Sequence, residues 1–488
     1  MSDREPTAGA ADDAAFDADG APAIDAANRP KAYRAVWRWH FYLGLLVAPV
    51  LLLLATTGAL YLFDTEIERA WYREQMNVVA GERPATAAAQ EARVRLAFPR
   101  AELVSVAWPR DATHVSAWTI IDPEAGRLQV LVDPWRARVI GTMDDHSRVM
   151  YIVSSLHGEL MLGAFGDRIV ELVASCTLLM MVTGLYLWWP KRWRLRSVLI
   201  PRWGAKGRAF WRDLHAVPSA LLAVGVIFLV LSGLPWSGFW GDSLAKLGTL
   251  SEQTMPTPNF RAPPVPDATD STAFDVGKIG SATVDDPHAL HRGTEALPWA
   301  IRQSDPPSAR TSPGRRQTIG LAQVMEISIA RGLTRTGPRL RVFYPEGPLG
   351  VFTVSLVPAR AQEQRTLYID PRSGEVLGDI GWKQYSPLGR AVEFGVMTHL
   401  GQQFGEVNRW LMLVICLGII VAVVAGLILW WRRRPVGGFG APDARGGTLP
   451  RPLLAGMVVV GVLFPFAGIV LLVIGLLEKI GSMRTASR

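Results

Sequence analysis

Four of the eight histidines stand beside long apolar segments, at positions that repeat along the chain. His40 precedes a Thr-Gly pair by the same interval at which His215 precedes a Ser-Gly pair, and His157 and His399 each precede a glycine by 27 residues. A lone histidine at a helix end is often an interfacial or capping residue, whereas ionisable groups at membrane depth are costly and usually functional. Histidine nitrogens are axial ligands of haem iron. The matched spacing therefore favours iron ligation.

The histidines belong to a duplication that covers most of the chain. The segment "LHGELMLGAFGDRIVELVASCTLLMMVTGLYLWWPKR" matches "THLGQQFGEVNRWLMLVICLGIIVAVVAGLILWWRRR", and upstream of these "LVDPWRARVIG" (131–141) matches "YIDPRSGEVLG" (368–378). Repeats in membrane proteins often place a functional site at their interface. We interpret the chain as one unit used twice, each unit consisting of a span, an external domain and a second span.

The elements that must position the histidines are membrane helices. The chain has 488 residues, 49% of them hydrophobic, and a bilayer crossing takes about 20 apolar residues. Both cysteines, Cys176 and Cys416, lie inside apolar runs, so the sequence predicts no disulfide framework and no CxxCH haem attachment. Five apolar runs are long enough to cross, near 41–63, 168–189, 216–236, 408–431 and 452–477.

Basic residues give these spans a direction. The segment "PKRWRLRSVLIPRWGAKGRAFWRD" carries eight Lys or Arg against one Asp, and "WWRRRP" follows the fourth span. The positive-inside rule places both on the cytoplasmic side, and the flanking spans argue against a nucleic-acid patch. The external domains, and the C-terminus after a fifth span, then face the periplasm.

This topology sorts the four histidines into two pairs. His40 and His215 fall at the cytoplasmic face, and His157 and His399 fall at the periplasmic face. Haem iron takes two axial ligands on opposite faces of a flat ring, and facing helices of a bundle can supply them. We therefore predict two b-type haems with bis-histidine ligation, an inner one held by His40/His215 and an outer one held by His157/His399. Two histidines are too few for a zinc site.

Taken together, the histidine-bearing spans, the "DPxxGEVLG" turn and the closing "LFPFAGIVLLVIGLL" resemble the PepSY-associated transmembrane family of iron-regulated bacterial membrane proteins, which includes ferric-siderophore reductases of the inner membrane. The resemblance covers about residues 34–480. In the first repeat, Arg136-Ala137-Arg138 stands where the glycine of the turn would fall. The implied fold class is a membrane all-α helical bundle of about five spans, internally duplicated, with two small periplasmic α+β PepSY-like domains.

The predicted domain order follows from these assignments. It is a disordered cytoplasmic tail (1–33), a first span (34–63), a first periplasmic PepSY-like domain (64–156), a second span (157–190), a basic cytoplasmic loop (191–214), a third span (215–236), a second PepSY-like domain (237–398) with a loop insertion (252–315), a fourth span (399–431), a cytoplasmic loop (432–451) and a fifth span (452–477). Glycine-containing polar stretches at 163–168 and 403–409 predict a helix break after each outer histidine.

Two axial histidines fill the coordination sphere of iron, which favours electron transfer over oxygen chemistry. The chain has no GxGxxG fingerprint at a strand–helix junction, so we expect the electrons to come from quinol or from a cytoplasmic reductase. The resemblance implies a ferric siderophore as the periplasmic acceptor. Hard oxygen donors hold Fe(III) better than Fe(II), so one electron loosens the complex.

Two other functions stay open at this point. One is a cytochrome b subunit that feeds a soluble periplasmic redox partner. The other is a non-redox PepSY regulatory or anchor protein, which would not need matched histidines. A reduced-minus-oxidised absorption spectrum separates the anchor from the two redox interpretations.

Several further residues are weaker candidates. His288 and His291 form an HxxH pattern in the loop insertion and are more simply surface residues than metal ligands. Arginines make good partners for carboxylates such as haem propionates. Four lie near the ligand positions on the appropriate faces, and topology or solvation explains them nearly as well: Arg38, Arg148, Arg212 and Arg390.

Overall fold

The structure is a computed structural model of the chain. The predicted tail, the basic loop and the loop insertion lie partly or wholly outside the residues described, as do His288 and His291. The described residues are 31–109, 111–190, 199–250, 297–302, 306–309, 318–333, 340–347, 349–435, 437–438, 440 and 449–486. They divide into two compact units, one with Met1–Pro49, Ser175–Ala223 and Gly418–Arg488, the other with Val50–Ala174 and Val224–Leu417.

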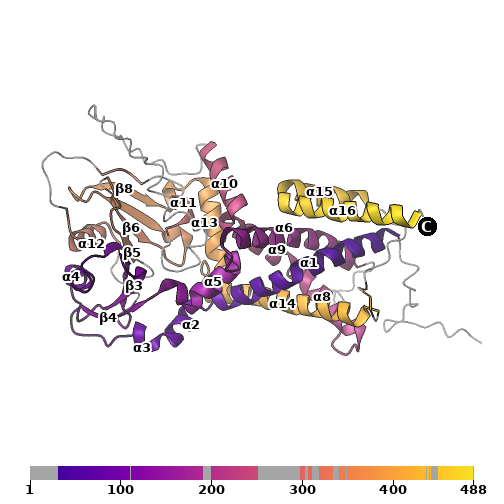
Figure 1. Cartoon of the computed structure of the whole chain (residues 1–488), viewed down its shortest axis with the longest axis horizontal. Coiled ribbons are helices and arrows are strands. Elements are labelled where there is room, and N and C mark those ends of the chain that lie inside the picture. Colours follow the sequence, from indigo (N-terminus) through magenta and orange to yellow (C-terminus); the bar gives the residue numbers. More distant parts are fainter. Residues whose placement is uncertain are drawn as a thin grey trace, which may run out of the picture. The chain divides into compact units, whose positions relative to one another are not determined.

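Within the described ranges, eight strands of the second unit form one antiparallel sheet, in the order β4-β3-β2-β1-β5-β6-β7-β8 (Figure 1). The strands are β1 Glu102–Ala107, β2 Ser116–Asp122, β3 Gly126–Asp133, β4 Arg138–Met143, β5 Leu340–Phe343, β6 Phe352–Leu356, β7 Arg365–Ile369 and β8 Val376–Gly381. Each repeat contributes four consecutive strands, which pair with their neighbours in sequence. Their sequences are rich in β-branched and other apolar side chains, of which the β-branched and aromatic ones favour strands.

The two sets of strands join at the centre through β1 and β5, which pair antiparallel. Val106 faces Val342, and each of these valines stands three residues before a proline, Pro109 or Pro345. The duplicated strands therefore meet at equivalent positions. The prediction of two small separate domains is corrected by this pairing. An exposed strand edge carries unpaired N–H and C=O groups, and joining the two modules removes one such edge from each.

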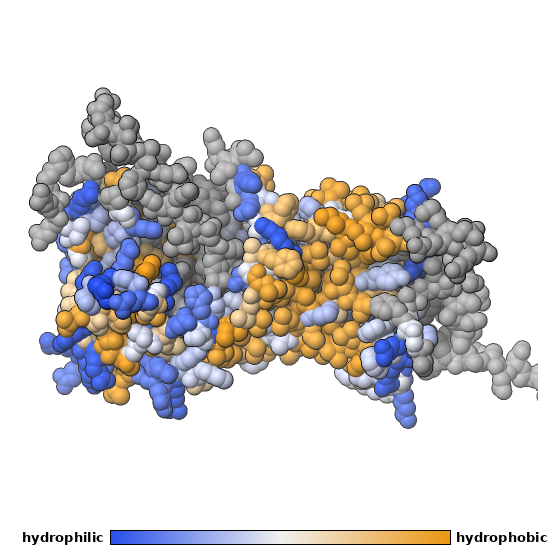
Figure 2. All heavy atoms as spheres, viewed as in Figure 1, coloured by the Kyte–Doolittle hydropathy of each residue, from blue (hydrophilic) through white to orange (hydrophobic). Residues whose placement is uncertain are grey.

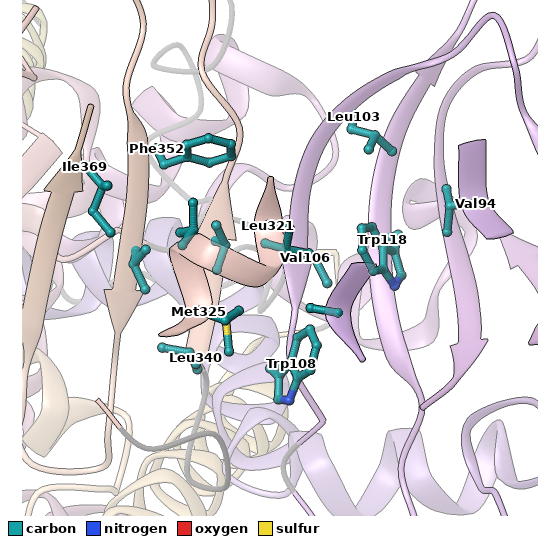
Figure 3. Close-up of a cluster of buried hydrophobic side chains, with 14 of the residues drawn as sticks. Val94, Leu103, Val106, Trp108, Trp118, Leu321, Met325, Leu340, Phe352 and Ile369 are labelled. Atoms are coloured by element: carbon teal, nitrogen blue, oxygen red, sulfur yellow. The ribbon is translucent and has the colours of Figure 1, made fainter. Parts of the chain in front are cut away.

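Helices bury both faces of the sheet. Along β7, Leu367 and Ile369 enter one core while Tyr368 enters the other, because successive side chains of a strand point to opposite faces. In the first core, α4 (Ala87–Ala97) and α12 (Leu321–Ala330) pack on the strands, as Figure 3 shows for Val94, Leu321, Met325 and their neighbours.

The second core packs α11 (Trp299–Arg302) and α13 (Pro387–His399) against the opposite face. Buried Glu393 of α13 ties this layer together. It accepts hydrogen bonds from the Ala300 N–H and the Gln364 side-chain amide, both at 3.0 Å. These contacts hold α13 rigidly on the sheet, and its last residue is His399.

The same turn closes both halves of the sheet. In the second half the Asp370 carboxylate accepts backbone N–H groups at 2.7 and 3.0 Å, and Gly374 has φ +75°. In the first half Asp133 accepts equivalent bonds at 2.8 and 3.3 Å, and Ala137 has φ +48°. The alanine thus adopts the left-handed conformation that favours glycine. The turn is therefore conserved in shape although its glycine is absent from the first repeat.

Three helices in the described part of the chain are long and apolar enough to cross a membrane: α1 Lys31–Tyr61, α6 Gly163–Trp188 and α14 Glu406–Arg433. A fourth crossing is available if α8 (Arg208–Leu221) and α9 (Ala223–Gly233), which bend by 59° at Leu222, act as one span. This crossing begins before the predicted residue 215. Hydrophobic residues cover most of the surface over the apolar helices in Figure 2, in contrast to the sheet. The chain is a membrane protein.

The predicted fifth span, 452–477, is wrong. This region forms two helices, α15 (Arg451–Leu463) and α16 (Pro465–Ala486), which lie side by side (Figure 1). The chain reverses at Phe464, so that Gly461 and Gly468 come into direct contact. The apolar part of each helix has 13 residues, or about 20 Å, which is less than the roughly 30 Å core of a bilayer. The C-terminal end of the hairpin therefore returns toward the side from which α15 starts.

The predicted helix breaks after the outer histidines are present. Helix α5 (Val149–Glu159) ends two residues after His157, and the chain passes through Leu160 and Met161 with φ +55° and +56° before α6 begins. Helix α13 ends at His399, and α14 begins at Glu406 rather than at the predicted residue 399. The remaining described elements are α2 Asp64–Trp71, α3 Arg73–Met76, α10 Gly238–Leu250 and the short turns η2 Asp145–Ser147, η3 Leu234–Trp236, η5 Ala361–Glu363 and η6 Trp382–Gln384.

Candidate functional site

The four histidines lie in two opposed pairs. The rings of His40 on α1 and His215 on α8, both in the first unit, have centres 6.2 Å apart and planes inclined at 69°. The rings of His157 on α5 and His399 on α13, both in the second unit, have centres 6.4 Å apart and planes inclined at 82°. Each pair takes one histidine from each repeat, in the combination that the topology predicts.

These separations fit two ligands on opposite sides of one metal ion. A metal–imidazole bond is about 2 Å long and the ring centre lies about 1 Å behind the nitrogen, so trans ligands have ring centres about 6 Å apart. Among the described residues, no group of three or more His, Cys, Asp and Glu side chains surrounds a common point. Haem iron needs only two protein ligands.

Three of the imidazoles meet a side-chain hydroxyl through Nδ1. The Nδ1···Oγ contacts are His40–Thr183 at 2.9 Å, His157–Thr57 at 3.0 Å and His399–Ser232 at 2.9 Å. Each hydroxyl also lies 2.7–2.9 Å from the carbonyl oxygen four residues before it in its own helix. Two oxygens this close need a proton between them, and a carbonyl oxygen has none. The hydroxyl therefore donates its single proton to the carbonyl. The hydroxyl oxygen then accepts from the imidazole, which fixes the proton on Nδ1 and leaves Nε2 with its lone pair.

The fourth imidazole reaches the same state by another route. His215 donates its Nδ1–H to the backbone carbonyl of Ala422 on α14, at 2.7 Å. A carbonyl oxygen can only accept, so Nδ1 carries the proton here too. Metal-ligating histidines almost always donate their other ring N–H in this way, which holds the ring and selects the tautomer. All four histidines therefore present Nε2 in the form that binds iron.

A glycine stands against each of the four rings. A Cβ placed on it would lie 3.1 to 3.5 Å from the nearest ring atom, in the pairs Gly184 with His40, Gly58 with His157, Gly233 with His399 and Gly426 with His215. Most of these distances are tighter than normal carbon contacts. The four glycines let the imidazoles approach the neighbouring helix closely enough to form their Nδ1 hydrogen bonds. This explains why the glycine intervals match along the chain.

Burial sets the charge of the outer ligand that lies outside the spanning helices. His399 keeps some accessible ring surface, but it lies deep among other side chains, and this desolvation lowers the pKa of its imidazole to about 4. A neutral imidazole is the form that ligates metals. His399 is therefore neutral at neutral pH.

The four arginines proposed as propionate partners lie in differing surroundings. Arg38 is buried, but two residues along a helix turn by about 200°, so it leaves α1 on a different side from His40. Arg148 forms a largely buried ion pair with Glu68. Arg212 contacts Asp213 at 3.3 Å, and Arg390 donates to two backbone carbonyls. Their role toward a haem stays a prediction.

The sequence reasoning missed the hydroxyl partners Thr57, Thr183 and Ser232. The available signal was the Ser/Thr that precedes the matched glycine at three of the four positions. Its meaning was hidden because each hydroxyl lies 100 residues or more from its histidine in sequence.

The chain matches a known family over most of its length. Residues 37–433 match the family profile described as the PepSY-associated TM region, an interval that contains all four histidines, their hydroxyl partners and the four glycines. The α15–α16 hairpin lies beyond the matched residues. A comparison with curated proteins found no match. Because the family match covers well over half of the 488 residues, the chain belongs to the PepSY-associated transmembrane family, as its sequence predicts.

Proposed function

We propose that this protein is a di-haem b-type oxidoreductase of the bacterial inner membrane, which carries electrons from the cytoplasmic side to the periplasm and reduces ferric siderophores so that Fe(II) is released. One haem would be held by His40 and His215, the other by His157 and His399. The observation that carries the proposal is the opposed imidazole pair, present twice, with ring centres 6.2 and 6.4 Å apart.

The side chains around each pair support this assignment. When bound, each haem supplies a one-electron centre with both axial positions filled by protein. Thr57, Thr183 and Ser232 hold three of the imidazoles through Nδ1 and keep the proton away from Nε2. The facing glycines let each ring approach the helix that carries its Nδ1 partner. Such positioning lowers the cost of ordering the ligands when the cofactor binds.

The connection between sheet and histidines supports an acceptor near the outer pair. In the first half β4 leads through η2 into α5, which carries His157. In the second half β8 leads through η6 into α13, which carries His399. The sheet consists of the residues that the Lys/Arg distribution assigns to the periplasm. A substrate bound beside the sheet would thus meet the outer pair first.

A ferric siderophore suits such a site chemically. Its hard oxygen donors bind Fe(III) strongly and Fe(II) weakly, so transfer of one electron converts Fe(III) to Fe(II) and loosens the complex. The electron donor would be quinol or a cytoplasmic reductase. The cytochrome b alternative shares every feature of the two pairs and differs only in the acceptor. A non-redox anchor has no use for opposed imidazoles with fixed tautomers.

The decisive experiment uses the purified full-length protein under anaerobic conditions. After chemical reduction, addition of a ferric siderophore should restore the oxidised absorption spectrum and release Fe(II) to a ferrous chelator. The His157→Ala variant should lose this reaction, and the His40→Ala variant, reduced in advance, should keep it. Absence of haem bands would leave the anchor interpretation. Reoxidation by a soluble periplasmic protein, but by no ferric siderophore, would favour the cytochrome subunit.

A further inference from the structure

The four imidazoles do not have the same hydrogen-bond partner. Three donate to a hydroxyl at 2.9–3.0 Å, whereas His215 donates directly to a peptide carbonyl, that of Ala422, at 2.7 Å. The difference originates in one residue. At the position before the matched glycine, where the other sites have Thr or Ser, α14 has Ala425.

The carbonyl that His215 uses is the one that the missing hydroxyl would have contacted. At the other three sites the hydroxyl lies 3.2–3.3 Å from the carbonyl three residues before it, and Ala422 stands three residues before Ala425. A hydroxyl thus stands beside this carbonyl at three sites, and at one of them the Leu229 carbonyl also interacts with His399, whereas at His215 the carbonyl is the acceptor without a hydroxyl beside it.

The Nδ1 of His215 lies closer to its facing glycine than the Nδ1 atoms of the other three histidines lie to theirs. From a Cβ placed on the facing glycine, Nδ1 lies 3.7–4.0 Å away at the three hydroxyl sites but 3.1 Å away at Gly426. The Cε1 of His215 lies 3.3 Å from the same point, within the 3.2–3.5 Å of the other sites, so the ring is turned with its Nδ1 edge toward α14. Ala425 is fully buried, so the position of the missing hydroxyl lies inside the protein.

The partner of Nδ1–H controls how strongly the ring donates electrons to a metal. A stronger acceptor draws the N–H proton away from the ring and raises the basicity of the ligating nitrogen. The peptide carbonyl of Ala422, at 2.7 Å, lies closer to Nδ1 than the hydroxyls at 2.9–3.0 Å and is therefore the stronger acceptor. A more electron-rich ligand stabilises ferric over ferrous iron.

We propose that the Ala422 carbonyl, exposed to His215 because Ala425 lacks a hydroxyl, lowers the reduction potential of the site formed by His40 and His215. Ala425 is then a positioning residue that tunes this site through His215. The proposal rests on the proposed haem function. A lower reduction potential at the site where electrons enter favours their transfer onward to the other site.

The test introduces the missing hydroxyl. Ala425→Ser restores the arrangement of the other three sites, and Ala425→Val adds bulk without a hydroxyl. Both are placed in a His157→Ala background, which should retain only the haem of this site. The full-length protein is purified with its haem, and its midpoint potential is measured by a reductive titration followed by absorption, with electron paramagnetic resonance to record the ligand field.

Ala425→Ser should raise the potential. The expected change in the ferrous-to-ferric ratio at fixed ambient potential is roughly two- to tenfold, the size of one altered hydrogen bond, and tenfold corresponds to 59 mV for one electron. Ala425→Val should not reproduce the rise. An unchanged or lowered potential in the serine variant, or an equal rise in the valine variant, overturns this proposal while leaving haem binding intact. A protein that binds no haem overturns the proposed function as well.

Discussion

Replacing Thr57 by valine should weaken cofactor binding at the outer pair without changing the shape of the site. Valine has nearly the volume of threonine but no hydroxyl. Thr57 is buried and holds the Nδ1 of His157 at 3.0 Å. The substitution removes the Thr57 hydroxyl from the N–H of His157 and releases the ring from the tautomer that presents Nε2.

The size of the effect follows from the lost hydrogen bond. A buried donor left unsatisfied costs about 1–3 kcal/mol, and every 1.4 kcal/mol is a factor of about ten in an equilibrium constant. We therefore expect haem affinity at this site to fall by roughly fivefold to a hundredfold, in the range found when partners of metal ligands are removed. A ring that turns to reach another acceptor offsets part of this cost and moves the loss of affinity toward the lower end of the range.

The neighbouring residue supplies a matched control. Thr56 lies on the same helix and donates to the carbonyl of Leu52 at 2.8 Å, as Thr57 does to that of Leu53, but it is exposed and contacts no histidine in the structure. Thr56→Val and Thr57→Val are compared in a His40→Ala background, where only the outer haem should remain. The measurement is the rate of haem loss to an excess of a haem-scavenging protein. Equal rates in the two variants would refute the tautomer argument.

Three further predictions follow from the same geometry. Alanine at either His40 or His215 should remove the same haem, so that the haem-to-protein ratio falls from two towards one in each variant and falls no further in the double variant. Gly184→Ala should displace the ring of His40, because the added Cβ would lie 3.2 Å from its Cε1, and the haem spectrum of that site should broaden or vanish. Gly44→Ala, whose Cβ would meet only a flexible methionine end at 3.4 Å, is its control and should bind normally. Because α15 and α16 form a hairpin, a cysteine at Ala486 in a background without native cysteines should resist an impermeant thiol reagent added from the periplasm, and labelling from that side would contradict the hairpin.

The sequence by itself determined the pairing of the histidines. Matched intervals placed His40 with His215 and His157 with His399, because a duplicated chain with a fixed membrane direction brings equivalent positions to the same face. It also located the turn at Asp370, since turn chemistry acts over a few residues. These features depend on turn residues and on the distribution of charged and apolar residues, both of which can be identified in the sequence.

Other features were decided only by tertiary structure. The pairing of Val106 with Val342 joins strands more than two hundred residues apart, and neither strand's sequence indicates which strand it pairs with. Hydropathy cannot reveal the reversal at Phe464. The run 452–477 is equally apolar whether it forms one long helix or two short antiparallel helices. Pro465 was the local hint, since proline cannot continue the preceding helix.

The partners of the imidazoles show the same division most clearly. Glycine spacing was visible in the sequence, but its purpose required the distance from each glycine to a ring carried by another helix. Ala425 looks like an ordinary small core residue until the carbonyl of Ala422 is found 2.7 Å from His215. A hydrogen bond acts over about 3 Å and depends on direction, so only the packed helices determine which oxygen each imidazole meets.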